Sequence, residues 1–171
     1  MKYPHLNNNR LPWLIARASE LIGTREIVGR LHNPDIIQWG KDVGVGRTYT
    51  NDEIPWCGLF TAKVCQLAHK DIVKNPLWAR NWAKWGIESP EASLGDILVF
   101  KRGSGGHVGF YVAEDDTCYH VIGGNQNNTV NITRISKKRT LAVRRAKYRN
   151  TPQSVIPYYV QSNGKISLNE S

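Results

Sequence analysis

The chain has 171 residues and a formal net charge of +9, and its composition is ordinary for a globular protein, with 40% hydrophobic and 22% charged residues. This length predicts one domain over residues 1–171, with a core of about 11–149 and a C-terminal tail over 150–171. No apolar run reaches the roughly 20 residues that a membrane helix needs, and the N-terminus has no signal-peptide pattern, so we expect synthesis in the cytoplasm. The positive charge favours an anionic partner, such as nucleic acid, acidic lipid or a bacterial envelope polymer.

Two helix-start signals stand in the first quarter of the chain. A helix is predicted over residues 11–24, with a proline near its first turn and Gly23 near its end. Asn33, Pro34 and Asp35 supply a capping residue, a proline at the first position and an acid in the first turn. They predict a second helix that ends in a glycine-rich loop.

The central feature is a third helix that begins at Cys57, directly after a proline and a tryptophan. Phe60, Val64 and Leu67 repeat on one face of it, and we expect it to end near His69. A cysteine in the first turn lies near unpaired backbone N–H groups and the positive end of the helix dipole. Both favour the thiolate, so the sequence predicts a lowered pKa and a nucleophilic sulfur. A small buried hydrophobe is the alternative interpretation.

A tryptophan stripe follows this helix. Asn75 and Pro76 repeat the helix-start signal, and Trp78, Trp82 and Trp85 then fall at the spacing i, i+4, i+7. We favour the packing of a short helix against the body of the protein. The alternative is one wall of a groove that binds sugar or peptide.

After Leu94 the apolar residues alternate with period two. Strands are predicted over residues 97–100, 107–112, 118–122, 129–135 and 141–145. Short connections between strands imply antiparallel neighbours. Helices followed by a strand meander predict an α+β fold, with N-terminal helices packed on an antiparallel sheet of about five strands.

Three polar residues converge in this arrangement. His107 begins a strand directly after a glycine run, and Asn125 follows two glycines at the end of the next strand. Neighbouring antiparallel strands bring these two ends together, and a helix packed on the sheet can point Cys57 at His107. This set predicts the nucleophile, base and orienting group of a cysteine hydrolase, in which Asn125 accepts the second ring N–H of His107.

Four segments in this order resemble motifs of the NlpC/P60 and CHAP superfamily, the papain-like cell-wall cysteine peptidases and amidases. They are residues 56–60, 95–100, 106–111 and 123–126, and the resemblance runs over about residues 11–145. It implies Cys57 as nucleophile, His107 as base and Asn125 as the third residue, with Gln126 as the fallback. Many NlpC/P60 members have aspartate before the cysteine and histidine as the third residue, so this chain is more similar to CHAP-like branches.

The resemblance implies a papain-like NlpC/P60-type domain that hydrolyses an amide bond of peptidoglycan through a thioester, as an endopeptidase or an N-acetylmuramoyl-L-alanine amidase. No metal or cofactor is implied, and the expected partner of the monomer is peptidoglycan rather than nucleic acid. A compact basic domain is similar to a bacteriolytic phage or prophage endolysin, which acts on the cell wall in the periplasm or after lysis. The alternatives are a secreted antibacterial amidase effector, and a non-catalytic basic module that binds wall polymer or nucleic acid.

Other polar residues are weaker candidates. Trp56, Asp52 and Gln126 lie near the catalytic residues and are candidate substrate contacts, although a solvated loop is the simpler interpretation of Asp52. Three cysteines match no zinc pattern and predict free thiols. Cys118 and His120 alternate on one strand and are candidate ligands or a second dyad. The densest basic cluster, for which we favour a solvated hairpin and turn, comprises Lys137, Lys138, Arg139, Arg144, Arg145, Lys147 and Arg149.

Overall fold

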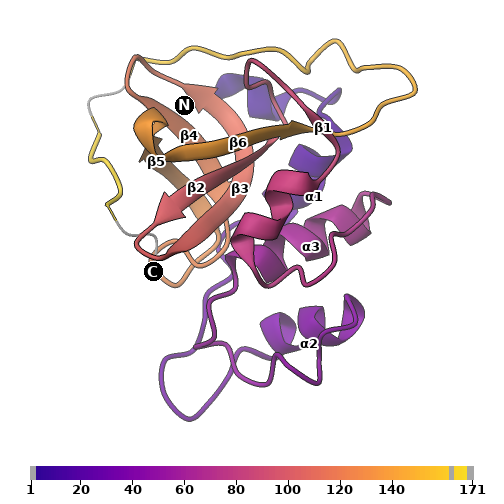
Figure 1. Ribbon diagram of the computed structural model, residues 1–171, viewed down its shortest axis with the longest axis vertical. Coiled ribbons are helices and arrows are strands. Elements are labelled where there is room, and N and C mark those ends of the chain that lie inside the picture. The colour runs from indigo at the N-terminus through magenta and orange to yellow at the C-terminus, as the bar shows by residue number, and fades with distance from the viewer. Residues whose placement is uncertain (1–2, 162–163, 169–171) are drawn as a thin grey trace.

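The computed structural model describes residues 3–161 and 164–168. In these residues the chain forms an antiparallel sheet of six strands in the order β1-β6-β2-β3-β4-β5, with the α-helices packed beside it (Figure 1). The helices are η1 (Pro4–Asn7), α1 (Trp13–Glu20), α2 (Pro34–Asp42), α3 (Cys57–Leu67), η2 (Ala79–Lys84) and η3 (Lys137–Arg139). The strands are β1 (Ile87–Glu88), β2 (Ile97–Arg102), β3 (Gly105–Glu114), β4 (Cys118–Gly123), β5 (Asn131–Ser136) and β6 (Thr140–Arg145). The predicted α+β class is confirmed.

The first two helices start where their sequence signals lie. At α2 the side chain of Asn33 accepts a hydrogen bond from the backbone N–H of Asp35 at 2.9 Å, which satisfies one of the free donors of the first turn. Helix α1 begins at Trp13 and ends at Glu20, before the predicted stop at Gly23. None of the helices in the described residues is both long enough and apolar enough to cross a bilayer.

The sequence predicts a helix with α-helical spacing over the tryptophan stripe, but this segment contains only the short 3-10 helix η2. Asn75 has a φ of 53° in the left-handed region, so Asn75 does not cap an α-helix. Trp82 and Trp85 are buried, and each indole N–H donates to a backbone carbonyl, at 2.9 and 2.7 Å. The packing interpretation therefore holds for these two, whereas Trp78 is 73% exposed.

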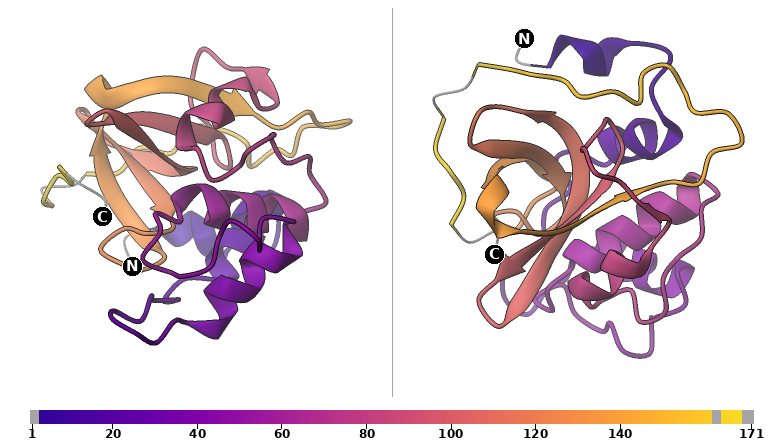
Figure 2. Two further views of the ribbon diagram at one scale, coloured as in Figure 1. Left: turned by 60° about the horizontal axis from the view of Figure 1, so that its bottom comes forward. Right: turned by 45° about the horizontal axis from the view of Figure 1, so that its top comes forward.

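The last strand does not pair with its predicted neighbour. Strand β6 pairs with β2, on the far side of the sheet from β5, although only η3 separates the two along the chain. Across a flat sheet, four strand spacings would separate β6 from β5 by roughly 19 Å. The link from Ser136 to Thr140 reaches only about 14 Å when fully extended. The sheet must therefore curl, as both views in Figure 2 show.

Two apolar clusters lie on the two faces of this curled sheet. The larger cluster lies between the helices and the sheet, and α3 contributes Leu59, Phe60, Val64 and Cys65 to it. Because α3 is apolar on most of its sides, burial against β3 and α1 is its stable arrangement. The smaller cluster consists mainly of strand residues on the other face, including Phe100 and Tyr111.

The C-terminal tail packs on the core where the structure describes it. The backbone N–H of Tyr158 donates to the Tyr111 hydroxyl at 3.1 Å, and the ring of His5 stacks on Tyr158 with centroids 4.0 Å apart. Tyr159 forms a parallel β-bridge with Glu114. Looseness was predicted for the last residues, and residues 169–171 lie outside the described part of the chain.

Candidate active site

The thiol of Cys57 lies at the N-terminal end of α3, as the sequence predicts. Cys57 is the first residue of the helix and is only 2% exposed. The next residue must be glycine, because a Cβ on Gly58 would lie 2.2 Å from the carbonyl oxygen of Pro76. The segment before η2 therefore crosses directly over the start of α3 and keeps this end of the helix in place.

The first residues of β3 bring His107 to the same place. Pairing between β3 and β4 begins at Phe110 and Ile122, so residues 105–109 extend beyond the end of β4 on that side. The backbone N–H of Val108 faces the sulfur of Cys57. Because Val108 directly follows His107, the backbone of the predicted base lies close to the predicted nucleophile.

The hydrogen-bond partner of His107 is Gln126. The Nε2 atom of His107 lies 3.0 Å from Oε1 of Gln126, and both side chains are completely buried. The amide nitrogen of Gln126 donates to the carbonyl oxygens of Val121 and Asn131, at 3.2 and 2.7 Å. Because these bonds fix which end of the amide is the oxygen, Nε2 of His107 must carry the proton. In the neutral imidazole, Nδ1 is then the basic nitrogen.

The prediction that Asn125 orients His107 is therefore wrong by one residue. Asn125 has a φ of 53°, in the left-handed region that asparagine tolerates better than most residues. Asn125 lies in the turn after β4, and this turn places the side chain of the next residue, Gln126, beside His107. Gln126 is also predicted as a substrate contact, but its amide oxygen and nitrogen are already engaged by His107, Val121 and Asn131.

Two glycines make this turn possible. A Cβ on Gly123 would lie 2.8 Å from Oε1 of Gln126 and 3.2 Å from Nε2 of His107, in the space that their hydrogen bond occupies. A Cβ on Gly124 would lie 2.5 Å from Cβ of Phe60. The glycine pair thus lets the turn contact both His107 and the first turns of α3.

The electrostatics of Cys57 differ from the prediction. Burial raises the pKa of the Cys57 thiol, although the positive charge of Arg102 and the N–H groups of Val108 and Gly58 act in the opposite direction. The helix start stabilises the thiolate as expected, but the loss of hydration on burial is larger. The lowered pKa that the sequence predicts is wrong, so the sulfur is a neutral thiol at neutral pH and needs a base to become a nucleophile.

The other two predicted substrate contacts have structural roles instead. Trp56 is completely buried, and its indole N–H donates to the carboxylate of Glu26 at 2.8 Å. The buried carboxylate of Asp52 accepts from the backbone N–H groups of Ile27 and Asn33, at 3.0 and 2.8 Å. Both residues hold the loop over residues 25–33 against the start of α3.

The second candidate dyad forms a hydrogen-bond chain that joins the N-terminal segment to the sheet. His120 Nε2 lies 2.9 Å from Asp115, and His120 Nδ1 lies 2.7 Å from the hydroxyl of Tyr3. Cys118 is buried, and it joins this chain only through its backbone N–H, which donates to Asp115 at 3.0 Å. Within the described residues, no group of three or more His, Cys, Asp and Glu side chains is placed to hold a metal ion.

Much of the basic cluster is tied to the protein surface. Arg145 makes a two-pronged contact with Asp96, at 2.9 and 2.8 Å, and Arg144 donates to the carbonyl of Trp85 at 2.6 Å. Lys137 forms an ion pair with Glu114. The predicted solvated hairpin is therefore wrong: β6 pairs with β2 rather than with β5, and these three side chains are bonded to other parts of the protein.

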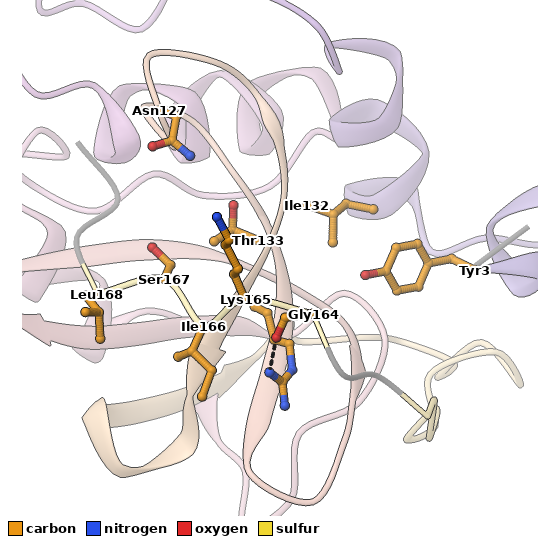
Figure 3. A pocket seen from close by; sticks show the side chains of 10 residues that line it. Tyr3, Asn127, Ile132, Thr133, Gly164, Lys165, Ile166, Ser167 and Leu168 are labelled. Atoms are coloured by element: carbon orange, nitrogen blue, oxygen red, sulfur yellow. Dashed lines mark hydrogen bonds between the residues drawn. The ribbon is translucent and has the colours of Figure 1, made fainter.

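A cavity of about 550 Å³ lies elsewhere, between β5 and residues 164–168 (Figure 3). Its wall includes Tyr3, Thr133 and Arg134, whose guanidinium donates to the carbonyl of Gly164. Neither Cys57 nor His107 lines it, so it is separate from the candidate active site. In comparisons with known proteins, no family model and no curated sequence matches this chain.

Proposed function

We propose that this protein is a cysteine hydrolase that cleaves an amide bond of peptidoglycan, with Cys57 as nucleophile and His107 as general base. The observation that carries the proposal is a helix-start thiol whose sulfur lies at the backbone N–H of Val108, next in the chain to a buried histidine whose tautomer is set by Gln126. A nucleophile, a base and a group that orients the base form the minimal set for this chemistry.

The chemistry follows from the positions of these groups. His107 Nδ1 takes the thiol proton as the sulfur of Cys57 attacks the amide carbon, and the backbone N–H groups at the start of α3 stabilise the oxyanion. The imidazolium then protonates the leaving amine, which leaves a thioester on Cys57. Water activated by His107 hydrolyses the thioester and restores the thiol. Because the thiol is neutral before the reaction, general-base catalysis fits this site better than a preformed ion pair.

Peptidoglycan is the substrate that the sequence supports best. Four motif segments resemble those of NlpC/P60 and CHAP cell-wall hydrolases, and the net charge of +9 suits an anionic wall. The α+β architecture is compatible with a papain-like domain of this type, which we propose here together with an endolysin-like role at the cell wall.

The proposal is tested by digestion of purified peptidoglycan and soluble muropeptides, with mass spectrometry of the products. Cys57→Ala and His107→Ala should each abolish cleavage while circular dichroism stays unchanged. Cys118→Ala is the matched control, because this thiol is also buried but lies on β4, outside the proposed site. Cleavage that survives Cys57→Ala, or a parent protein that cleaves no muropeptide, would overturn the proposed function.

A further inference from the structure

The end of β2 brings an arginine to the candidate active site. In the β2–β3 pairing Phe100 lies opposite His107 and Arg102 lies opposite Gly105. Arg102 and His107 are therefore diagonal neighbours on the same face of the hairpin, within reach of a long side chain. Since Gly105 has no side chain, the space above it is open to the guanidinium of Arg102.

The guanidinium of Arg102 differs from the other arginines of the sheet. Its Nη1 atom is buried and has no hydrogen-bond acceptor among the described residues. Arg134 and Arg145, by contrast, each contact a carboxylate, on Asp115 and Asp96. A buried cationic donor without an acceptor is unfavourable, and an anionic ligand would supply the missing acceptor.

The same charge acts on the nucleophile. Arg102 is the charged side chain whose field reaches the sulfur of Cys57 and favours negative charge there. The cation thus lies diagonal to the histidine and its field acts on the thiol, close to where part of a bound substrate must lie during attack. The planar guanidinium fork matches the two oxygens of a carboxylate.

We propose that Arg102 forms an anion-binding subsite near Cys57 that holds a carboxylate of the substrate close to the scissile bond. The identity of this ligand as a peptidoglycan stem-peptide carboxylate rests on the proposed function. The presence of an anion-selective subsite does not, because it can be measured without turnover.

The test compares how fast Cys57 is alkylated by iodoacetate and by iodoacetamide, two reagents of similar size that differ in charge. Mass spectrometry of peptides follows Cys57 alone. Arg102→Gln should lower the ratio of the iodoacetate rate to the iodoacetamide rate by about tenfold, the effect of one charge at close range. Lys101→Gln is the matched control, since it removes the same charge from the adjacent residue of β2, whose side chain is exposed to solvent. Its ratio should equal that of the parent.

Two results would overturn the subsite. If Arg102→Gln slows both reagents equally, Arg102 only activates the thiol. If Lys101→Gln lowers the ratio as much, the effect belongs to the overall charge of the protein.

A muropeptide and its carboxyl-amidated form give the second arm of the test. Arg102→Lys, which keeps the charge but loses the fork, should raise KM for the carboxylate form and leave KM for the amidated form unchanged. An equal change in both KM values would overturn the proposal, and this arm decides if Arg102→Gln does not fold. Alkylation that depends on Arg102 in a protein that cleaves no muropeptide would support the subsite and refute the proposed function. If cleavage depends on Cys57 but the alkylation ratio is unchanged in Arg102→Gln, the proposed function is supported and the subsite is refuted.

Discussion

Replacing Gln126 by alanine tests the central contact of the candidate site. The change removes the oxygen that accepts from Nε2 of His107 and the amide that donates to Val121 and Asn131. The buried N–H of His107 then lacks its acceptor, which costs about 1–3 kcal/mol of stability. The melting temperature should therefore fall, and the variant should still fold.

The effect on turnover follows from the charge that forms on His107 during the reaction. A hydrogen bond to a charged group is worth about 1.5–3 kcal/mol, so loss of the Gln126 oxygen should lower kcat roughly ten- to 150-fold. KM should change little, because the polar atoms of Gln126 are engaged by His107, Val121 and Asn131 rather than left for substrate.

Steady-state kinetics on one soluble muropeptide measures both constants, and thermal unfolding gives the stability. Asn125→Gly is the control, because it removes the neighbouring side chain while glycine keeps the left-handed backbone of the turn. If Asn125→Gly loses kcat while Gln126→Ala stays near the parent, the assignment of the orienting residue is refuted.

Three further predictions concern other parts of the molecule. Gly123→Ala should lower kcat about as much as Gln126→Ala, because the new Cβ would lie 2.8 Å from the Gln126 oxygen; normal kinetics would contradict the tight turn. The rate at which iodoacetamide labels Cys57 should keep rising above a pH of about 8.5, since burial raises the pKa of this thiol, and a plateau below pH 7 would contradict that. Arg134 and His120 hold the pKa of the Asp115 carboxyl well below its usual range, so its contribution to stability is present above a pH of about 4 and is lost on acidification. Asp115→Asn should therefore unfold about 2–4 kcal/mol more easily at pH 7, and a difference that does not shrink as the pH falls from 4 to 2 would contradict the ion pair.

Local patterns predict the positions of Cys57 and His107 well. A proline and a tryptophan before an apolar helical pattern mark the start of α3, and a glycine run before alternating apolar residues marks the start of β3. Both signals lie within a few residues of the side chain concerned, so they do not depend on the rest of the fold.

Features that depend on distant parts of the chain are the ones that the sequence does not predict. Two successive amides, Asn125 and Gln126, are equally able to accept from His107, and the left-handed backbone of Asn125 decides which one points inward. The raised pKa of Cys57 comes from burial by remote segments, whereas the sequence displays only the helix start. Strand β6 follows β5 after a short link, yet it pairs with β2 because the sheet curls.

The link through η3 also limits how the sheet can open. Strands β5 and β6 lie near opposite edges of the sheet, and three residues, Lys137–Arg139, join them. If β6 separates from β2, the short link pulls on β5, and fraying at one edge is transmitted to the other. Local unfolding at either edge therefore involves both strands as one unit, and the paired centre formed by β2, β3 and β4, on which His107 is held, opens last.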